Sequence, residues 1–377
     1  MIKIVLISNF LSIHQIDICN AFLNHNDIDF TFVSSYGPSG FKKKVSTNFE
    51  FLPFVVRSYE SSLSFEKAKK ISEEADLVII GSGNNKLISS RNKLIFRYSE
   101  HFSKKRFLFF LRAISIHLRY RKEQRNGYLL CASSYAKRDF NYAGLYRNKC
   151  IYYGYFPHIQ ISHSKPKLLF KNDIIHLLWV GRGIYWKHPE TAFKIASFLK
   201  KNNINFELTV VSEENELIKR IRNKYNNVSN CVNFYQTLTN DKVLKLMFES
   251  DIFLFTSDRQ EGWGAVLNEA MASGCVCFAN IAAGSTRFLI KQGFNGFSYR
   301  NLNQLKKMIL EAINNKESLL NISLNATKTI LGTWNANVAA ENIIGLYTSI
   351  KSGIEIPKKY INNGPGTLIV SKTTNKI

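Results

Sequence analysis

The feature that most constrains the fold is a series of short apolar runs, rich in Ile, Val and Phe, separated by segments long enough for a helix. Strands this apolar are buried on both faces, which is typical of parallel sheets covered by helices. The pattern occurs twice and predicts an α/β chain with two doubly wound sheets. The runs lie at residues 2–7, 30–33, 77–80, 128–132 and 151–155, and again at residues 174–180, 206–211, 232–235, 252–255 and 276–279.

Helix signals fall between these runs. Thr239 can cap a helix in which Val243 and Met247 belong to one apolar stripe. Pro189 suits the first turn of another helix, where its missing amide hydrogen is not needed. Strands that alternate with helices in this way indicate βαβ units.

The length of 377 residues fits two domains of similar size. We expect an N-terminal Rossmann-like domain over residues 1–165, a C-terminal one over residues 166–353 and a loose tail over residues 354–377. The polar, basic segment 162–173 is the expected linker. Two doubly wound domains that face each other place the carboxyl ends of both sheets at a central cleft, the usual ligand site of such folds.

The charge is strongly basic, with 51 Lys and Arg against 28 Asp and Glu, a formal net charge of +23. A surplus of this size indicates nucleic acid, an acidic membrane surface or a phosphorylated ligand as partner, unless the charge is spread over solvated faces. Nucleic acid is the reading we set aside. The chain has no helix-turn-helix, zinc-finger or RNP-like signature, and it has no second basic patch at groove spacing.

The surplus is concentrated between Lys86 and Arg125, where cations alternate with Phe, Leu and Ile. This block could form a basic, aromatic-rich helix, with Phe107, Phe109 and Phe110 among its apolar residues, that lies on an anionic bilayer. Alternatively, it forms an ordinary helix that buries its aromatics against the sheet and turns its cations outward.

Signals for secretion, membrane spanning and metal binding are weak. The N-terminal MIKIVLISNF has no small-residue cleavage site, and no stretch approaches about 18 uninterrupted apolar residues. We therefore expect a cytoplasmic protein that is at most peripheral on the inner face of the cell membrane. The cysteines have no metal-ligand spacing and predict buried thiols in a reducing compartment. They are Cys19, Cys131, Cys150, Cys231, Cys275 and Cys277.

The segment from Asp251 to Asn280 contains the first candidate site. It reads as strand, loop, helix and strand, with Glu261 at the end of the loop. Gly262 and Gly264 let the backbone approach a ligand closely, and the amides at the start of the next helix can hold a phosphate. Glu269 follows Glu261 with seven residues between them.

The segment from Leu177 to Glu190 contains the second candidate site. A buried strand ends in Gly181 and Arg182, and Lys187 follows five residues later near a helix start. Two cations at the carboxyl end of a strand can neutralise a diphosphate, Arg by paired hydrogen bonds and Lys as a point charge.

Together, in this order, the two segments resemble the family 4 glycosyltransferases of the GT-B fold. The motifs are Glu-x7-Glu, as Glu261 and Glu269, Gly-Arg-x4-Lys, as Arg182 and Lys187, and the later GSTRFLIKQGFNGF. The resemblance covers most of the chain and is greatest for bacterial members that build capsular or other surface polysaccharides.

The resemblance implies a role for each residue. It places Glu261 on the donor sugar, Glu269 on the ribose, and Arg182 and Lys187 on the departing diphosphate. Backbone amides near the start of the helix would face sugar and phosphate. The residues that supply them are Gly262, Trp263, Gly264, Ala265 and Val266.

The activity that the resemblance implies is retaining, metal-independent transfer of a sugar from a nucleotide diphosphate sugar to a lipid-linked glycan, with no cofactor. Fixed cations and a carboxylate suit this chemistry, because negative charge gathers on the leaving diphosphate and positive charge on the anomeric carbon. Two alternatives stay open: a sugar-nucleotide epimerase of the same fold, and a catalytically silent binding subunit of a polysaccharide assembly complex.

The first domain matches the family less well. The turn from Ser8 to Asp17 lacks the glycines that often help to hold phosphate in relatives. His14, at the expected start of the first helix, could orient an acceptor hydroxyl or be merely structural. Glu100 is the second acceptor-side candidate, because FRYSEH stands where many relatives carry a His-Glu pair.

Overall fold

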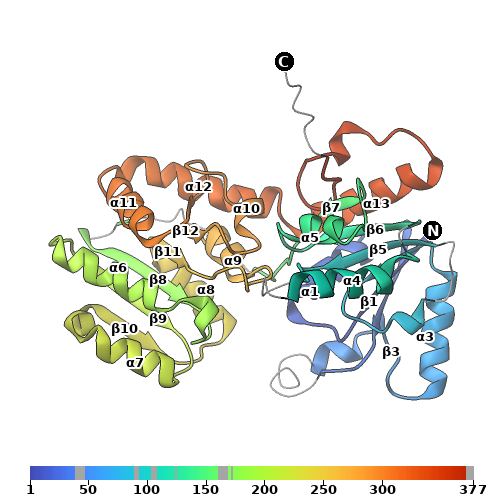
Figure 1. The fold of residues 1–377 in the computed structure, drawn as a ribbon, viewed down its shortest axis with the longest axis horizontal. Coiled ribbons are helices and arrows are strands. Elements are labelled where there is room, and N and C mark those ends of the chain that lie inside the picture. The colour runs from blue at the N-terminus through green and yellow to red at the C-terminus, as the bar shows by residue number, and fades with distance from the viewer. Residues whose placement is uncertain are drawn as a thin grey trace. The chain divides into compact units, whose positions relative to one another are not determined.

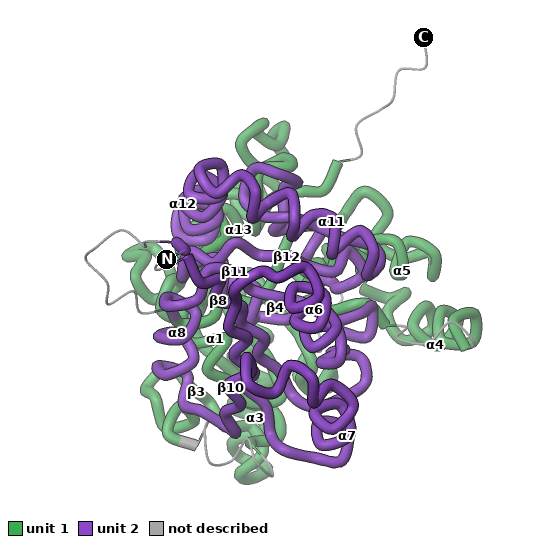
Figure 2. Tube along the Cα trace, turned by 90° about the vertical axis from the view of Figure 1, so that its left-hand side faces the viewer, with its two compact units in different colours: residues 1–158, 334–377 green, residues 159–333 purple. Residues whose placement is uncertain are grey.

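The computed structural model describes residues 1–38, 47–88, 93–102, 108–123, 125–159, 169–170 and 173–370. The chain divides into two compact units, which Figure 2 distinguishes by colour. Unit 1 comprises residues 1–158 and 334–377, and unit 2 comprises residues 159–333. Most of the expected linker at residues 162–173 lies outside the described residues.

Unit 1 is built on a parallel sheet of seven strands in the order β3-β2-β1-β4-β5-β6-β7 (Figure 1). The order reverses between β1 and β4, which is the mark of a doubly wound sheet. The strands are β1 (Ile2–Ser8), β2 (Ile28–Ser34), β3 (Val55–Arg57), β4 (Leu77–Ile80), β5 (Leu94–Ser99), β6 (Gly127–Cys131) and β7 (Cys150–Tyr152).

Alternate residues of each strand point to opposite faces of this sheet. Ile4 and Leu6 of β1 pack against α1 (Ile13–Leu23) and α13 (Ala336–Ser352), while Val5 and Ile7 pack on the side of α3 (Ser62–Glu74). Both faces are therefore covered by helices, as the apolar strands require. The remaining helical elements are α4 (Phe109–Tyr120), α5 (Ala136–Tyr142) and the 3-10 turns η1 (Thr47–Phe51), η2 (Asn85–Leu87) and η7 (Lys358–Tyr360).

The C-terminal part of the chain differs from the expected boundaries. Residues 334–353, expected in the second domain, belong to unit 1, because α13 buries Ala339, Ala340 and Ile343 against the first sheet. The expected loose tail is also packed as far as residue 370. The amide of Ile369 donates to the carbonyl of Cys150, and the amide of Tyr152 donates to the carbonyl of Thr367, both at 2.8 Å. The tail therefore covers the edge strand β7.

Unit 2 is built on a parallel sheet of six strands in the order β10-β9-β8-β11-β12-β13 (Figure 1). The strands are β8 (Ile175–Val180), β9 (Phe206–Val211), β10 (Val232–Tyr235), β11 (Ile252–Phe255), β12 (Val276–Asn280) and β13 (Phe297–Tyr299). The helical elements are η5 (Tyr185–Lys187), α6 (Glu190–Lys201), α7 (Glu216–Lys224), η6 (Asn226–Cys231), α8 (Asn240–Glu249), α9 (Val266–Ala272), α10 (Thr286–Leu289), α11 (Leu302–Ile313) and α12 (Lys316–Gly332).

The predicted α/β fold with two doubly wound parallel sheets is confirmed. Thr239 is the N-cap of α8, whose Val243 and Met247 are buried, and Pro189 directly precedes α6. Three strands were not predicted: β3 and β13 have three residues each, and β5 contains Arg97. All six cysteines are free thiols, and Cys231 alone among them is not fully buried.

Candidate active site

The candidate site in unit 2 lies at the carboxyl ends of β8 and β11. These neighbours flank the point where the strand order of the second sheet reverses, so the loops that follow them diverge to opposite faces. The loop after β8 runs over residues 181–189, and the loop after β11 runs over residues 256–265. The Gly-Arg-x4-Lys motif lies in the first loop, and the Glu-x7-Glu motif begins in the second loop and ends in α9.

Hydrogen bonds join the two loops. The Thr256 hydroxyl donates to the backbone carbonyl of Lys187 and accepts from the indole Nε1 of Trp179 at 2.8 Å. The amide of Asp258 donates to the carbonyl of Trp186 at 2.9 Å, and its carboxylate lies 3.0 Å from Nε2 of His188. These contacts fix the backbone on both sides of Lys187, so its side chain starts from a defined position.

Lys187 and Glu261 form an ion pair between the loops. The two side chains are only 13% and 16% exposed, so the pair is shielded from most of the solvent. The Ser257 hydroxyl also donates to the same Glu261 oxygen at 3.2 Å. A cation and a carboxylate are therefore held together at the carboxyl ends of β8 and β11, where a ligand would bind.

The glycine-rich turn after Glu261 depends on the backbone freedom of Gly264. Its φ is +86°, and a Cβ at this position would lie 2.5 Å from Cζ of Phe255. The adjacent Trp263 is fully buried, and its Nε1 donates to Oδ1 of Asn268 at 2.9 Å. The Trp263 side chain thus anchors the turn from inside the unit, and only its backbone is placed to face a ligand.

Glu269 lies in the first turn of α9, three residues after Val266 and four after the N-cap Ala265. Its side chain is only 7% exposed, and burial raises the pKa of the carboxyl to about 7. The helix dipole at this end favours a negative charge, but the desolvation is the larger effect. Glu269 can consequently bind or release a proton near neutral pH, and it is suited to hydrogen-bond hydroxyl groups.

Arg182 also lies in the loop after β8, and its side chain is exposed. The loop after β12 approaches from the other side, where the amide of Gly284 donates to the carbonyl of Glu261 at 3.2 Å. The next residue, Ser285, is fully buried, and its hydroxyl has no partner among the residues that the structure describes. Three loops of unit 2 thus converge on Glu261.

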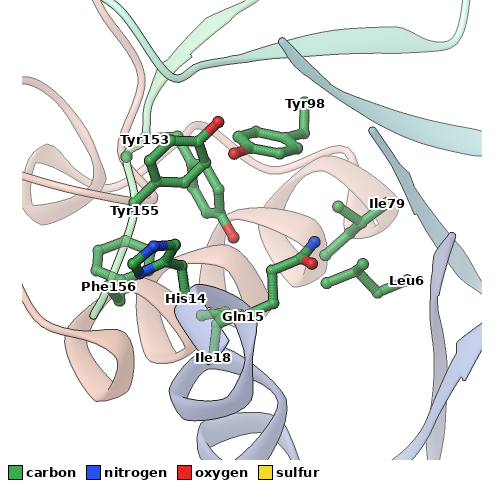
Figure 3. Close-up of a pocket in the computed structure, with 10 residues that line it drawn as sticks. Leu6, His14, Gln15, Ile18, Ile79, Tyr98, Tyr153, Tyr155 and Phe156 are labelled. Carbon is green, nitrogen blue, oxygen red and sulfur yellow. The ribbon is translucent and has the colours of Figure 1, made fainter. Parts of the chain in front are cut away.

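The acceptor-side candidates lie together in unit 1. His14 on α1 and Tyr155 beyond β7 have nearly parallel rings with centroids 6.2 Å apart, and the Tyr155 hydroxyl donates to Oε1 of Glu100 at 2.7 Å. Burial lowers the pKa of His14, so its imidazole is neutral at neutral pH. Figure 3 shows the small pocket that these rings line together with Tyr98 and Gln15.

The turn after β1 has its amides satisfied from within unit 1. The amides of Phe10 and Leu11 donate to Oδ1 of Asn9 at 3.0 Å and to Oε1 of Glu50 at 2.7 Å. The amide of Ser12 donates to the Gln15 side chain at 3.3 Å. This arrangement agrees with the lack of glycine in the turn, because the amides that could face a phosphate are already bonded to side chains.

The structure brings Lys187, Glu261 and the turn from residue 262 to 265 together, with Arg182 in the same loop as Lys187 and Glu269 in the helix that follows the turn. Sequence reasoning missed the Thr256 and Asp258 contacts and the link that Tyr155 makes between His14 and Glu100. The only signal in the sequence for these contacts is that Thr256 and Asp258 follow soon after a predicted strand and that Tyr155 ends another. Within the described residues, no group of three or more His, Cys, Asp or Glu could hold a metal ion.

Comparisons with known proteins agree with the motifs. Residues 160–329 match the family described as glycosyl transferases group 1. No curated protein sequence matches the chain. Among solved structures, the chain is similar to a glycosyltransferase from Rickettsia africae, with 14% sequence identity and a TM-score of 0.68 over 93% of this chain and 98% of that one.

Two further structures illustrate the range of similar proteins. One is Alr3699/HepE from Anabaena in complex with UDP and glucose, with 16% identity and a TM-score of 0.64 over 93% of this chain and 100% of that one. The other is a putative UDP-N-acetylglucosamine 2-epimerase from Listeria monocytogenes, with 14% identity and a TM-score of 0.58 over 94% and 98% of the two chains. At these identities the likeness is one of fold, and it confirms the GT-B class.

Proposed function

We propose, because residues 160–329 match the group 1 glycosyl transferases, that this chain is a retaining glycosyltransferase that takes a sugar from a nucleotide diphosphate sugar. The observation that most directly supports the proposal is the shielded Lys187–Glu261 ion pair at the strand-order reversal of the second sheet. UDP is bound in the solved structures of several similar proteins, which makes a uridine nucleotide the first donor to test.

Charge development along the reaction explains why such a pair is useful. As the sugar–phosphate bond breaks, the leaving diphosphate gains negative charge and the anomeric carbon gains positive charge. In our proposal, Lys187 and the exposed Arg182 stabilise the diphosphate, while Glu261 stabilises the sugar. Because the loops already hold Lys187 and Glu261, little reorganisation is needed when the donor binds.

Glu269 has a different role in this scheme. A carboxyl group buried in the first turn of α9 can accept hydrogen bonds from the two ribose hydroxyls once it is ionised. The first-turn amides of α9 and the turn at Gly262 and Gly264 would face sugar and phosphate. The leaving diphosphate would itself help to deprotonate the acceptor on the same face, so that the anomeric configuration is retained without a metal ion.

The acceptor would bind to unit 1. The side chains around His14 combine aromatic rings with the Tyr155–Glu100 hydrogen bond, and this mixture suits contact with a sugar, which has apolar faces and polar edges. We further propose that the acceptor is a lipid-linked glycan of a capsular or other surface polysaccharide. The enzyme would then act as a peripheral protein on the inner face of the cell membrane. No helix of the described residues is long and apolar enough to cross a bilayer.

The direct test is transfer from labelled nucleotide sugars to a membrane lipid extract, followed by determination of the anomeric configuration in the product. The proposal expects label in the lipid fraction, release of a nucleoside diphosphate, and the same anomeric configuration as in the donor. Transfer with the opposite anomeric configuration would contradict a retaining mechanism. Strict dependence of transfer on a divalent cation would contradict metal-independent catalysis.

An epimerase is the second candidate, because a putative epimerase shares the fold over most of both chains. It would consume the nucleotide sugar without any acceptor and yield a different sugar. Product analysis in the absence of acceptor separates the two functions. A protein that binds no nucleotide in calorimetry would instead be a catalytically silent binding subunit.

A further inference from the structure

Helix α4 carries an apolar stripe on its outer face that none of the described residues of unit 1 covers. Figure 2 shows α4 at the outer edge of this unit. Four large apolar side chains are exposed on it: Phe110 by 63%, Leu111 by 62%, Ile114 by 43% and Leu118 by 57%. At the 100° per residue of an α-helix they fall within an arc of about 100° and form one continuous stripe.

The opposite side of α4 is fixed to unit 1. Ala113 is buried, and His117 Nδ1 lies 2.8 Å from the carbonyl of Ala143. The ring of Tyr120 lies 4.1 Å below the guanidinium of Arg97, which makes two 2.7 Å hydrogen bonds to Glu123 directly after the helix. Because this inner face is held by specific polar and aromatic contacts, the helix cannot roll to bury its apolar stripe without breaking them.

Cations stand beside the stripe. Arg112, Arg119, Arg121 and Lys122 are all exposed, and α4 itself contains no acidic residue. Arg112, Arg119 and Lys122 follow the apolar arc on one side of the helix, and Arg121 lies within it. Apolar side chains flanked by Arg and Lys on a helix that lies flat are typical of segments that bind the interface of an anionic bilayer.

We propose that α4 is a membrane-docking surface that inserts its apolar stripe among the acyl chains of an anionic bilayer while its cations contact the lipid phosphates. The inference deepens the proposed function, because it names the face through which the enzyme would reach a lipid-linked acceptor. Of the two readings of the basic segment, the structure favours this one for residues 108–122, since Phe110 and the aliphatic side chains of the stripe are exposed, while only Phe109 and Tyr120 pack inward. Phe107 and the cations at 104–106 lie outside the described residues.

A bilayer fits this face better than a second copy of the chain. A symmetric dimer through α4 would bring the four exposed cations of each copy together, with no acidic residue on the helix to balance them. An acidic lipid surface balances the same charge and receives the apolar stripe as well. Each cation near such a surface contributes about 1 kcal/mol, which is roughly a fivefold gain in binding.

The experiment measures cosedimentation of the full chain with vesicles of phosphatidylcholine, with and without phosphatidylglycerol. The protein should bind the anionic vesicles, bind neutral ones far more weakly, and dissociate as salt is raised. Arg112→Gln combined with Arg119→Gln should weaken binding about 30-fold. Leu111→Ser combined with Leu118→Ser should weaken it at least tenfold, since these side chains would no longer enter the bilayer.

Matched controls come from unit 2, where Arg220 and Arg300 are exposed and Leu320 and Leu324 on α12 are 45% and 44% exposed. The corresponding double changes to Gln and to Ser should leave vesicle binding unchanged. Equal binding to neutral and anionic vesicles, or α4 variants that bind like their controls, would overturn the inference. Variants that merely lower stability would be revealed by the thermal unfolding midpoint.

Nucleotide binding, measured by calorimetry on the same samples, separates this inference from the proposed function. The α4 variants should bind UDP like the unchanged protein. If the protein binds UDP and transfers sugar but ignores anionic vesicles, the docking surface is wrong and the proposed function stands. If α4 mediates dimer formation in sedimentation analysis and vesicles do not bind, a second copy is the occupant and the inference fails.

Discussion

Changing Glu269 to Gln should stabilise the ligand-free protein at alkaline pH and leave its stability nearly unchanged at acidic pH. The pKa of the buried carboxyl is raised to about 7 from an ordinary value near 4.5. A carboxyl whose pKa is raised in the folded state binds its proton more tightly when folded, so the folded state loses stability as pH rises from about 4.5 to about 7. A neutral amide has no such loss.

The magnitude follows from the pKa difference. At 1.36 kcal/mol per pH unit, the ionised carboxylate costs the folded state about 3 kcal/mol above pH 7. Most of this difference develops between pH 5 and pH 8. We therefore expect the stability advantage of Glu269→Gln to grow by about 2 to 3 kcal/mol over that range. The full difference applies because the side chain is only 7% exposed, so solvent screens its charge very little.

Urea denaturation of both proteins at several pH values measures this difference. Glu249→Gln is the control, since its side chain is 56% exposed on α8 and should show no such trend. Glu269→Gln should also bind UDP more weakly, because an amide has only one acceptor oxygen for the hydrogen bonds of the two ribose hydroxyls. Binding of UDP to the unchanged protein should release protons near pH 6.5, as Glu269 ionises. A stability difference independent of pH would refute the reasoning about burial.

Three further predictions concern the other site residues. Lys187→Met should lower kcat/KM by about 10²- to 10³-fold, because the diphosphate loses a fixed cation and Glu261 loses its cationic partner. Arg182→Ala should lower turnover by at least about tenfold while the unfolding midpoint stays the same, since the side chain is exposed. Tyr155→Phe should raise the KM for acceptor about tenfold and leave UDP affinity unchanged, because Glu100 loses a hydrogen bond.

Each of these variants has a matched control. Lys194→Met removes a partly exposed pair with Glu190 on α6, and Arg220→Ala removes an exposed cation on α7. Tyr235→Phe changes a tyrosine that is 42% exposed. Steady-state kinetics should show normal constants for all three controls. A site variant that matches its control would remove that residue from the proposed mechanism.

The fold could be predicted from sequence where local composition determines burial. Strands such as β8 and β11 are apolar at nearly every position, because helices cover both faces of their sheet. The strand β5 was not predicted because it carries Arg97, and burial of that cation depends on Glu123, which is distant in sequence. The return of α13 to unit 1 also depends on long-range packing that no local pattern reveals.

In the candidate site, too, local sequence patterns did not reveal contacts between residues that are distant in sequence. The spacing of Arg182, Lys187, Glu261 and Glu269 identified both loops, since each motif directly follows a predicted strand. The ion pair between Lys187 and Glu261 could not be inferred, because it depends on β8 and β11 being neighbours in the sheet. For α4, composition indicated a basic, aromatic-rich helix but could not show which face unit 1 covers.

Calorimetric titration of nucleoside diphosphates, starting with UDP, tests the central claim that the loops after β8 and β11 form a donor site. We predict one binding site per chain, with affinity reduced at least tenfold by Lys187→Met and unchanged by Lys194→Met. Absence of binding for every nucleoside diphosphate, or equal affinity for both variants and the unchanged protein, would contradict the assignment.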